Sequence, residues 1–260
     1  MTRFRVDVGC VIHGSGYDWC YVEKLHSMVT RNLGLPVDFH VWTEHDRSVP
    51  PHMIKHCLDD WPGISGPKRS WWYKMQMFDA RHFAGDLLYF DLDTVICRDI
   101  TWITQNSTER FWTIRDFRYL QNPGWARMNS SVMWWNVAGM AYVWNSWCKN
   151  SPQHWAGRYH GDQDFLFHAI QAQDLSYYAD HRVQSWRWSA LDGGWDFQTR
   201  KHRQPGLGTR INPGSVSWCS TAAPSHARQA KTLSKGAFTR SPADRKSTRL
   251  NSSHITISYA

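Results

Sequence analysis

The chain has 260 residues, a length that suits one domain with a sizeable hydrophobic core. Its formal net charge is +8, but residues 217–260 contain seven Lys or Arg and one acidic residue, Asp244, and so carry +6 of that charge. The remainder is nearly neutral and lacks the basic face of a nucleic-acid-binding protein. Six scattered cysteines form no Cys-x-x-Cys pair, and no apolar run is long enough for a transmembrane helix. We therefore expect a cytoplasmic protein with no nucleic-acid partner and no transmembrane segment.

The first half of the chain alternates predicted strands and helices. Residues 5–13 predict a strand, and Gly14-Ser15-Gly16 interrupts it before a helix that Asp18 caps and that ends at Leu33. A second strand is predicted over residues 37–43, followed by a polar connection over 44–70, a helix over 71–83 and a strand over 87–91. This alternation of strands and helices is typical of a parallel α/β sheet.

The second half is mixed in character. Short strands are predicted over residues 111–114, 131–135, 175–179 and 183–188, and helices over 138–149 and 162–171. There are no internal repeats. The sequence thus predicts a single Rossmann-like α/β domain with a mixed, mostly parallel central sheet flanked by helices.

An Asp-x-Asp pair follows the most apolar of these strands. Residues 87–90 read Leu-Leu-Tyr-Phe, and Asp91 and Asp93 come directly after them. Side chains two positions apart on a strand point to the same side, and ligands of open α/β sheets bind at the carboxyl ends of strands. Two carboxylates there suit a hard cation such as Mn²⁺ or Mg²⁺, which can neutralise a diphosphate leaving group. The alternative is a pair of solvated aspartates in a turn.

Three further segments carry polar candidates, each with a structural alternative. Lys74 lies on the helix before the Asp-x-Asp strand and could pair with its carboxylates, reach a phosphate, or be solvated. Asn129 and Ser130 precede an apolar strand and could bind a sugar or form a turn. The run from Gly161 to Asp164 has the form of a helix N-terminus with acidic residues in the first turn, which could act on a substrate or serve as caps.

Taken in order, these motifs resemble the GT-A-fold glycosyltransferases, in particular the bacterial type related to family 8, the glycogenin and galactosyltransferase group. The resemblance covers about residues 4–216 and lies in the first strand with its glycine turn, residues 71–78, 88–95 and 129–136, and Gly161-Asp162-Gln163-Asp164. It implies metal-dependent transfer of a sugar from a nucleotide-sugar donor, with a UDP-sugar favoured, to a glycan, a lipid-linked sugar or a small acceptor.

The same resemblance implies roles for individual residues. Asp91 and Asp93 would hold Mn²⁺ or Mg²⁺, with Asp93 the principal ligand, and Asp162 and Asp164 would be the catalytic candidates. Donor-binding residues would be Ile12, Gly14, Tyr17, Lys74, Asn129, Ser130 and Gln163.

The C-terminal segment does not resemble a natural domain. Residues 244–254 match a peptide encoded by a common sequencing adapter, and 255–260 fit its continuation. Residues 217–226, read from the third base of permitted codons, give Val-Val-Phe-His-Gly-Arg-Pro-Lys-Pro, which resembles the His-Gly-x-x-Lys-Pro element that closes the site of several metal-dependent glycosyltransferases. We therefore expect a glycosyltransferase domain over residues 1–216, an out-of-frame segment over 217–243 and a disordered adapter-derived tail over 244–260. Loss of the closing His and Lys would weaken donor binding.

Two other functions remain open from the sequence. A sugar nucleotidyltransferase shares the sheet architecture but usually carries a glycine-rich, basic loop after its first strand, whereas residues 14–18 contain no Lys or Arg. A non-catalytic nucleotide-sugar or carbohydrate-binding protein would not need the metal.

Overall fold

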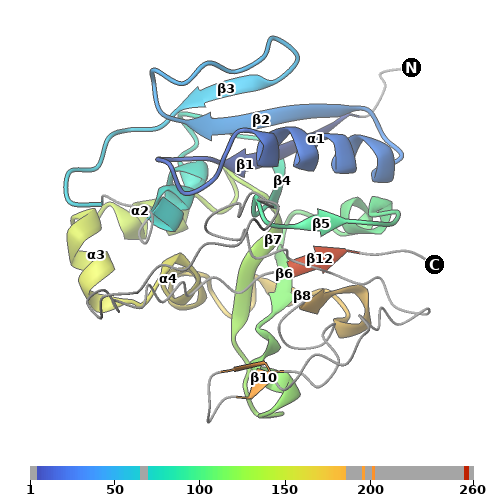
Figure 1. Ribbon diagram of the computed structural model, residues 1–260. Helices are drawn as coiled ribbons and strands as arrows, with labels where there is room; N and C mark the ends of the chain where they lie inside the picture. The colour runs from blue at the N-terminus through green and yellow to red at the C-terminus, as the bar shows by residue number, and fades with distance from the viewer. Residues whose placement is uncertain (1–4, 65–69, 186–194, 197–200, 203–254, 258–260) are drawn as a thin grey trace, which may run out of the picture.

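A seven-stranded sheet forms the centre of the molecule (Figure 1). The computed structural model describes residues 5–64 and 70–185, and the backbone of 195–196, 201–202 and 255–257. The strands of the sheet are β1 (Val6–Val11), β2 (Val37–Thr43), β3 (Ile54–Cys57), β4 (Asp86–Phe90), β6 (Phe111–Arg115), β7 (Met128–Asn136) and β8 (Leu175–Tyr177). Their order is β3-β2-β1-β4-β7-β6-β8, and β7 is antiparallel to both neighbours whereas the other pairs are parallel. The predicted mixed, mostly parallel sheet is therefore confirmed.

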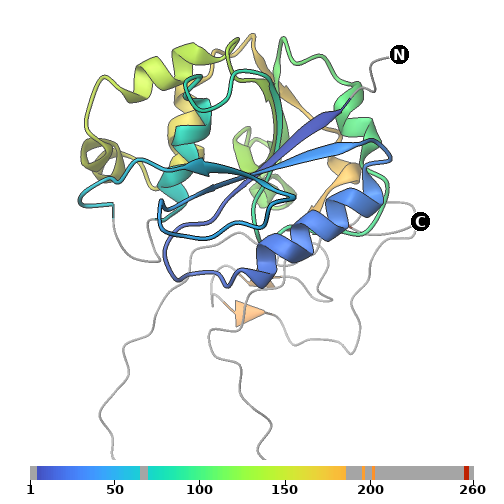
Figure 2. The ribbon, with the colours of Figure 1, turned by 90° about the horizontal axis from the view of Figure 1, so that it is seen from above.

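Helical segments cover both faces of the sheet (Figure 2). The α-helices are α1 (Cys20–Asn32), α2 (Ala141–Trp147), α3 (Pro152–Arg158) and α4 (Asp162–Ala169), and the 3₁₀ helices are η1 (Ser70–Phe78), η2 (Thr101–Gln105), η3 (Phe117–Leu120) and η4 (Asp180–Arg182). No helix within the described part of the chain has the length and apolar character needed to span a bilayer.

Alternating side chains divide the core into two layers. In β4, Leu88 and Phe90 pack with α1 on one face, while Leu87 and Tyr89 pack with η1, α2 and α4 on the other. Because successive strand side chains point to opposite faces, the continuous apolar run of β4 is what a central strand covered on both faces requires.

Several local predictions differ from the structure. The connection predicted over 44–70 contains the edge strand β3. Polar residues such as Lys55 and His56 interrupt the apolar pattern that would have predicted this strand. The helix predicted over 71–83 is a 3₁₀ helix that ends at Phe78. Helix α1 has Trp19 rather than Asp18 at its N-cap, although the Asp18 carboxylate accepts the N–H of Cys20 at 2.9 Å. Helix α3 was not predicted, even though Ser151 caps it and Pro152 opens it, as is usual at a helix start.

A smaller sheet joins β5 (Val95–Ile96), β12 (Ile255–Ile257) and β9 (Gln184–Ser185), and β10 (Trp195–Asp196) pairs with β11 (Lys201–His202). Strand β12 lies within the tail over 244–260 and pairs with β5 and β9, and the disorder expected for that tail stays a prediction. Residues 203–254 lie outside the described residues, so the frameshift and adapter hypotheses stay predictions.

Candidate active site

The predicted site residues come from segments that meet at the carboxyl end of β4. Strand β7 runs antiparallel to β4, so the start of β7 lies beside the end of β4, and the Asp91 N–H donates to the Ser131 carbonyl at 2.9 Å. Helices η1 and α4 pack together over the same region. Lys74, Asp91, Ser130 and Asp162, which span almost 90 positions of sequence, are thereby brought into one cluster.

An irregularity in β7 directs Ser130 into this cluster. The β6–β7 register pairs Thr113 with Met133 but Ile114 with Asn129, so residues 130–132 have no partner on β6. The Thr113 hydroxyl donates to the carbonyls of Asn129 and Val132, at 2.7 and 3.0 Å, and so helps to satisfy the interrupted ladder. Bulges of this kind often occur next to active sites because they re-aim a side chain.

Lys74 is a buried cation held between two carboxylates. Its Nζ lies 2.9 Å from Asp91 Oδ1 and 3.0 Å from Asp162 Oδ2, and the lysine is only 3% exposed. It also donates to the Ser130 carbonyl and hydroxyl at 3.3 and 3.2 Å, and the Ser130 hydroxyl donates to Asp162 Oδ2 at 2.7 Å. Lys74 is therefore paired with carboxylates in the structure and is not solvated.

The electrostatics of this cluster keep Lys74 charged. Burial alone lowers the pKa of the Lys74 ammonium, but the charges and hydrogen bonds of Asp162 and Asp91 together outweigh burial and raise the pKa above its ordinary value. Tyr89, which lies on β4 two residues before Asp91, donates its hydroxyl to Asp91 Oδ1 at 2.5 Å. Burial, and then the charge of Asp91, raises the pKa of Tyr89, so its hydroxyl remains a donor.

Asp93 lies beside the loop that follows β1. It is 6% exposed, whereas the Asp91 side chain is 26% exposed. Burial, the charges of Asp93 and Asp91, and a hydrogen bond with Asp93 raise the pKa of Tyr17. Tyr17 therefore lies near both aspartates, and its role in donor binding stays a prediction.

The glycine turn after β1 is fixed by a neighbouring loop. Gly14 has φ of 67°, its N–H donates to the Glu44 carboxylate, and its carbonyl accepts from Arg47 at 2.8 Å. Arg47 also pairs with Glu44 at 2.8 Å. Ile12 is 1% exposed and its side chain belongs to the core, so it can offer only backbone groups to a ligand.

A second polar group lies at the start of α4. As predicted, Gly161 is the N-cap and Asp162 and Asp164 are in the first turn. Asp164 Oδ1 lies 3.2 Å from Arg127 Nη1, and Gln163 Nε2 donates to Asp116 Oδ2 at 3.1 Å. The Asp164 side chain is 31% exposed, in contrast to the buried Asp162.

Asn129 is buried, and its side-chain oxygen accepts the Ser131 N–H at 3.0 Å, which ties it to the start of β7. Sequence analysis missed Tyr89, Arg127 and Asp116. Tyr89 could have been found, because side chains two apart on a strand share a face. Arg127 and Asp116 carry no comparable signal: the Asp116 N–H donates to the Arg127 carbonyl at 2.8 Å, and both side chains contact the first turn of α4.

The donor set near Asp91 and Asp93 fits a hard divalent cation that a substrate helps to hold. Among residues 5–64 and 70–185, no group of three or more His, Cys, Asp or Glu is placed to bind a metal ion. Mg²⁺, however, is commonly bound by one or two carboxylates together with substrate phosphates and water. Asp91 and Asp93 would supply these carboxylates.

The sheet order and its helical layers define the GT-A type of glycosyltransferase fold, which confirms the predicted fold class. No protein-family model matches the sequence, and no curated protein matches it.

Among solved structures, the chain is similar to the galactosyltransferase LgtC in complex with donor and acceptor sugar analogs, with 15% identity, 69% of this chain and 75% of that chain covered, and a TM-score of 0.50. An active-site mutant of LgtC gives 13% identity, the same coverage and a TM-score of 0.51.

Proposed function

We propose that the protein transfers a sugar from a nucleotide-sugar donor, with a UDP-sugar favoured, to a carbohydrate, lipid-linked or small acceptor, using Mn²⁺ or Mg²⁺ held by Asp91 and Asp93. The observation that carries the proposal is the buried Lys74 between Asp91 and Asp162 at the carboxyl end of β4. Burying the charges of Lys74 and Asp162 is costly and is not needed to form a sheet, so such clusters mark functional sites. The shared fold with LgtC supports the proposal.

The carboxylates of Asp91 and Asp93 would hold the cation. When bound, that cation would neutralise the diphosphate leaving group. Lys74 and Tyr89 both donate to Asp91 Oδ1, so they fix the orientation of this carboxylate. Lys74 is buried and its ammonium is paired with Asp91 and Asp162. Its role is therefore to position these two carboxylates rather than to contact a phosphate.

Asp162 and Asp164 differ in what they can do. Asp162 is buried and accepts from Lys74 and Ser130, so it completes the positioning network. Asp164 is partly exposed and Arg127 holds it, so it is the carboxylate better placed to accept hydroxyl groups of a donor sugar. Gln163 would assist there, and Gly14 and Tyr17 would line the nucleotide side.

Tryptophan fluorescence provides the test. The chain contains 17 tryptophans and would be titrated with UDP-glucose, UDP-galactose and GDP-mannose, with and without Mn²⁺. We expect saturable binding of a UDP-sugar that requires Mn²⁺ and is lost in Asp93→Asn. Glu109→Gln, which changes an exposed acid on the loop before β6, is the matched control and should bind normally.

Each contrary outcome is distinct. Donor binding that is independent of Mn²⁺ would contradict the metal site. Absence of binding by every sugar nucleotide would contradict the transferase and favour the non-catalytic alternative. Release of pyrophosphate from UTP and a sugar 1-phosphate would identify the nucleotidyltransferase instead.

A further inference from the structure

An aromatic groove lies away from the candidate active site. It has a volume of about 350 Å³ and is formed where η2, β6, β8 and η4 meet, with side chains that include Trp102, Gln105, Asn106, Trp112, Tyr178 and Arg182. This volume is within the range of roughly 300–1,000 Å³ that is typical of ligand sites.

The groove is separated from the Lys74 cluster in two ways. Trp112 pairs with Trp134, and Trp134 follows Ser130 by four residues in β7, which corresponds to about 13 Å along a strand. Trp112 and Trp102 also pack against the core layer that contains α1, whereas Lys74 lies on η1, which covers the opposite face. A ligand in the groove would therefore occupy a different site from the proposed donor.

Three aromatic rings of the groove support one another. The Tyr178 ring stacks near Trp112, with centroids 5.6 Å apart and planes at 24°, and meets Trp102 edge-on at 5.0 Å. The Trp112 indole N–H donates to the Ser107 carbonyl at 2.9 Å, and the Arg182 guanidinium lies over Trp102 at 5.1 Å. These contacts hold flat apolar surfaces in fixed positions.

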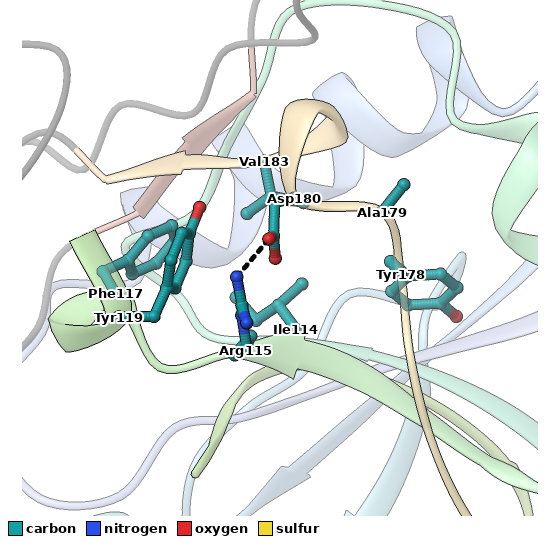
Figure 3. A pocket seen from close by; sticks show the side chains of 8 residues that line it. All are labelled: Ile114, Arg115, Phe117, Tyr119, Tyr178, Ala179, Asp180 and Val183. Atoms are coloured by element: carbon teal, nitrogen blue, oxygen red, sulfur yellow. Dashed lines mark hydrogen bonds and ion pairs between the residues drawn. The ribbon is translucent and has the colours of Figure 1, made fainter. Parts of the chain in front are cut away.

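Two buried donors at the groove have unmet hydrogen-bonding capacity. Within the described part of the chain, neither the Tyr178 hydroxyl nor the Trp102 indole N–H has a hydrogen-bond partner, and Tyr178 is 5% exposed. Tyr178 also borders a much smaller neighbouring cavity that contains the Arg115–Asp180 ion pair, and its hydroxyl points away from that pair (Figure 3). A buried hydroxyl without a partner is costly, and a polar occupant that reaches it through a small shift of the Tyr178 ring would relieve that cost.

We propose that this groove binds a carbohydrate chain. Pyranose rings present apolar C–H faces, which suit the electron-rich faces of aromatic rings, and they carry hydroxyl groups around their rims. The Gln105 amide, the side-chain oxygen of Asn106, the guanidinium of Arg182 and the Tyr178 hydroxyl would supply polar partners for those rims. The inference goes beyond the proposed donor chemistry and does not depend on a metal or a nucleotide.

The test is a titration of the full chain with cellohexaose and with maltohexaose, followed by tryptophan fluorescence and calorimetry. We expect saturable binding of at least one of them. Tyr178→Phe removes only an unpartnered hydroxyl, so it should leave thermal stability unchanged or higher and weaken binding about five-fold, the effect of one neutral hydrogen bond. Trp112→Ala should weaken binding at least ten-fold.

Two controls distinguish this site from the donor site. Trp144→Ala changes a half-buried tryptophan of α2 on the opposite layer and should leave oligosaccharide binding unchanged. Asp93→Asn should also leave it unchanged, so failure of the donor proposal would not affect this result. The inference is overturned if neither hexasaccharide binds at up to ~10 mM, or if binding is unaffected by Tyr178→Phe and Trp112→Ala.

Discussion

Replacing Lys74 with methionine tests the network at the end of β4 directly. The substitution keeps the length and packing of the side chain but removes the charge shared by Asp91 and Asp162. At 2.9–3.0 Å, each contact is worth about 5–6 kcal/mol at an effective dielectric of about 20, and desolvation of the three charges opposes this gain. Loss of one partner from a buried pair leaves an uncompensated charge, so we expect Lys74→Met to lower the free energy of unfolding by about 3–5 kcal/mol.

Urea denaturation at pH 7, followed by circular dichroism, measures this loss. Lys24→Met, which changes an exposed lysine of α1, is the matched control and should alter the unfolding free energy by less than about 0.5 kcal/mol. The double variant Lys74→Met/Asp162→Asn should recover about 1–2 kcal/mol relative to Lys74→Met, because it also removes the buried charge of Asp162 that Lys74→Met leaves without a cation.

The reasoning would be refuted if Lys74→Met cost less than about 1 kcal/mol, the range of an exposed ion pair. It would also be refuted if the double variant were no more stable than Lys74→Met, because the unpaired Asp162 would then not be the source of the instability.

Three further predictions concern stability. Hydrogen bonds from Arg47 and the Gly14 N–H outweigh burial and lower the pKa of Glu44 from 4.5 to about 2. The ionised Glu44 therefore stabilises the folded state above pH 4.5, and this stabilisation is lost as the pH falls towards 2. After allowance for solvent screening, Glu44→Gln should lower the free energy of unfolding by about 1–2 kcal/mol at pH 6 and leave it unchanged near pH 2. Urea denaturation at a series of pH values measures this. Gly9→Ala would place a methyl 2.7 Å from the Trp42 ring and should lower the free energy of unfolding by about 1–3 kcal/mol. Gly157→Ala, in α3 with open space around it, should be neutral or stabilising by up to about 1 kcal/mol. Thermal melts of the two variants test this difference. Ser130→Ala removes a buried 2.7 Å hydrogen bond and should cost about 1–2 kcal/mol in urea, and an unchanged midpoint would show that this contact is unimportant.

The central strands and the first helix could be predicted because their apolar periodicity is strong. Strand β2 has the predicted bounds, and β4 and β7 differ from their predicted ranges only at their ends. The edge strand β3 could not be predicted, because an edge position allows polar residues that hide the pattern.

The site was predictable where its residues stand on regular elements. The acidic first turn of α4 follows from helix geometry, whereas Asp91 and Asp93 lie in the turn that follows β4, where the Thr94 N–H donates to the Asp91 carbonyl at 3.0 Å. The pairing of Lys74 with Asp91 and Asp162 depends on the packing of η1 against α4 and on the bulge in β7. Neither feature can be predicted from the local sequence. The ion pair between Arg127 and Asp164 could not be predicted for the same reason, because it depends on tertiary packing.

The claim that Asp91 and Asp93 bind a donor through a divalent cation is tested most directly by electron paramagnetic resonance of Mn²⁺. The signal of free Mn²⁺ would be recorded with the protein, with and without the UDP-sugar that binds best. We predict that protein and UDP-sugar together deplete the free signal, that protein alone depletes it less, and that Asp93→Asn abolishes the difference. Equal Mn²⁺ binding with and without UDP-sugar would contradict the account. So would an Asp93→Asn variant in which UDP-sugar still increases Mn²⁺ binding as much as in the original protein.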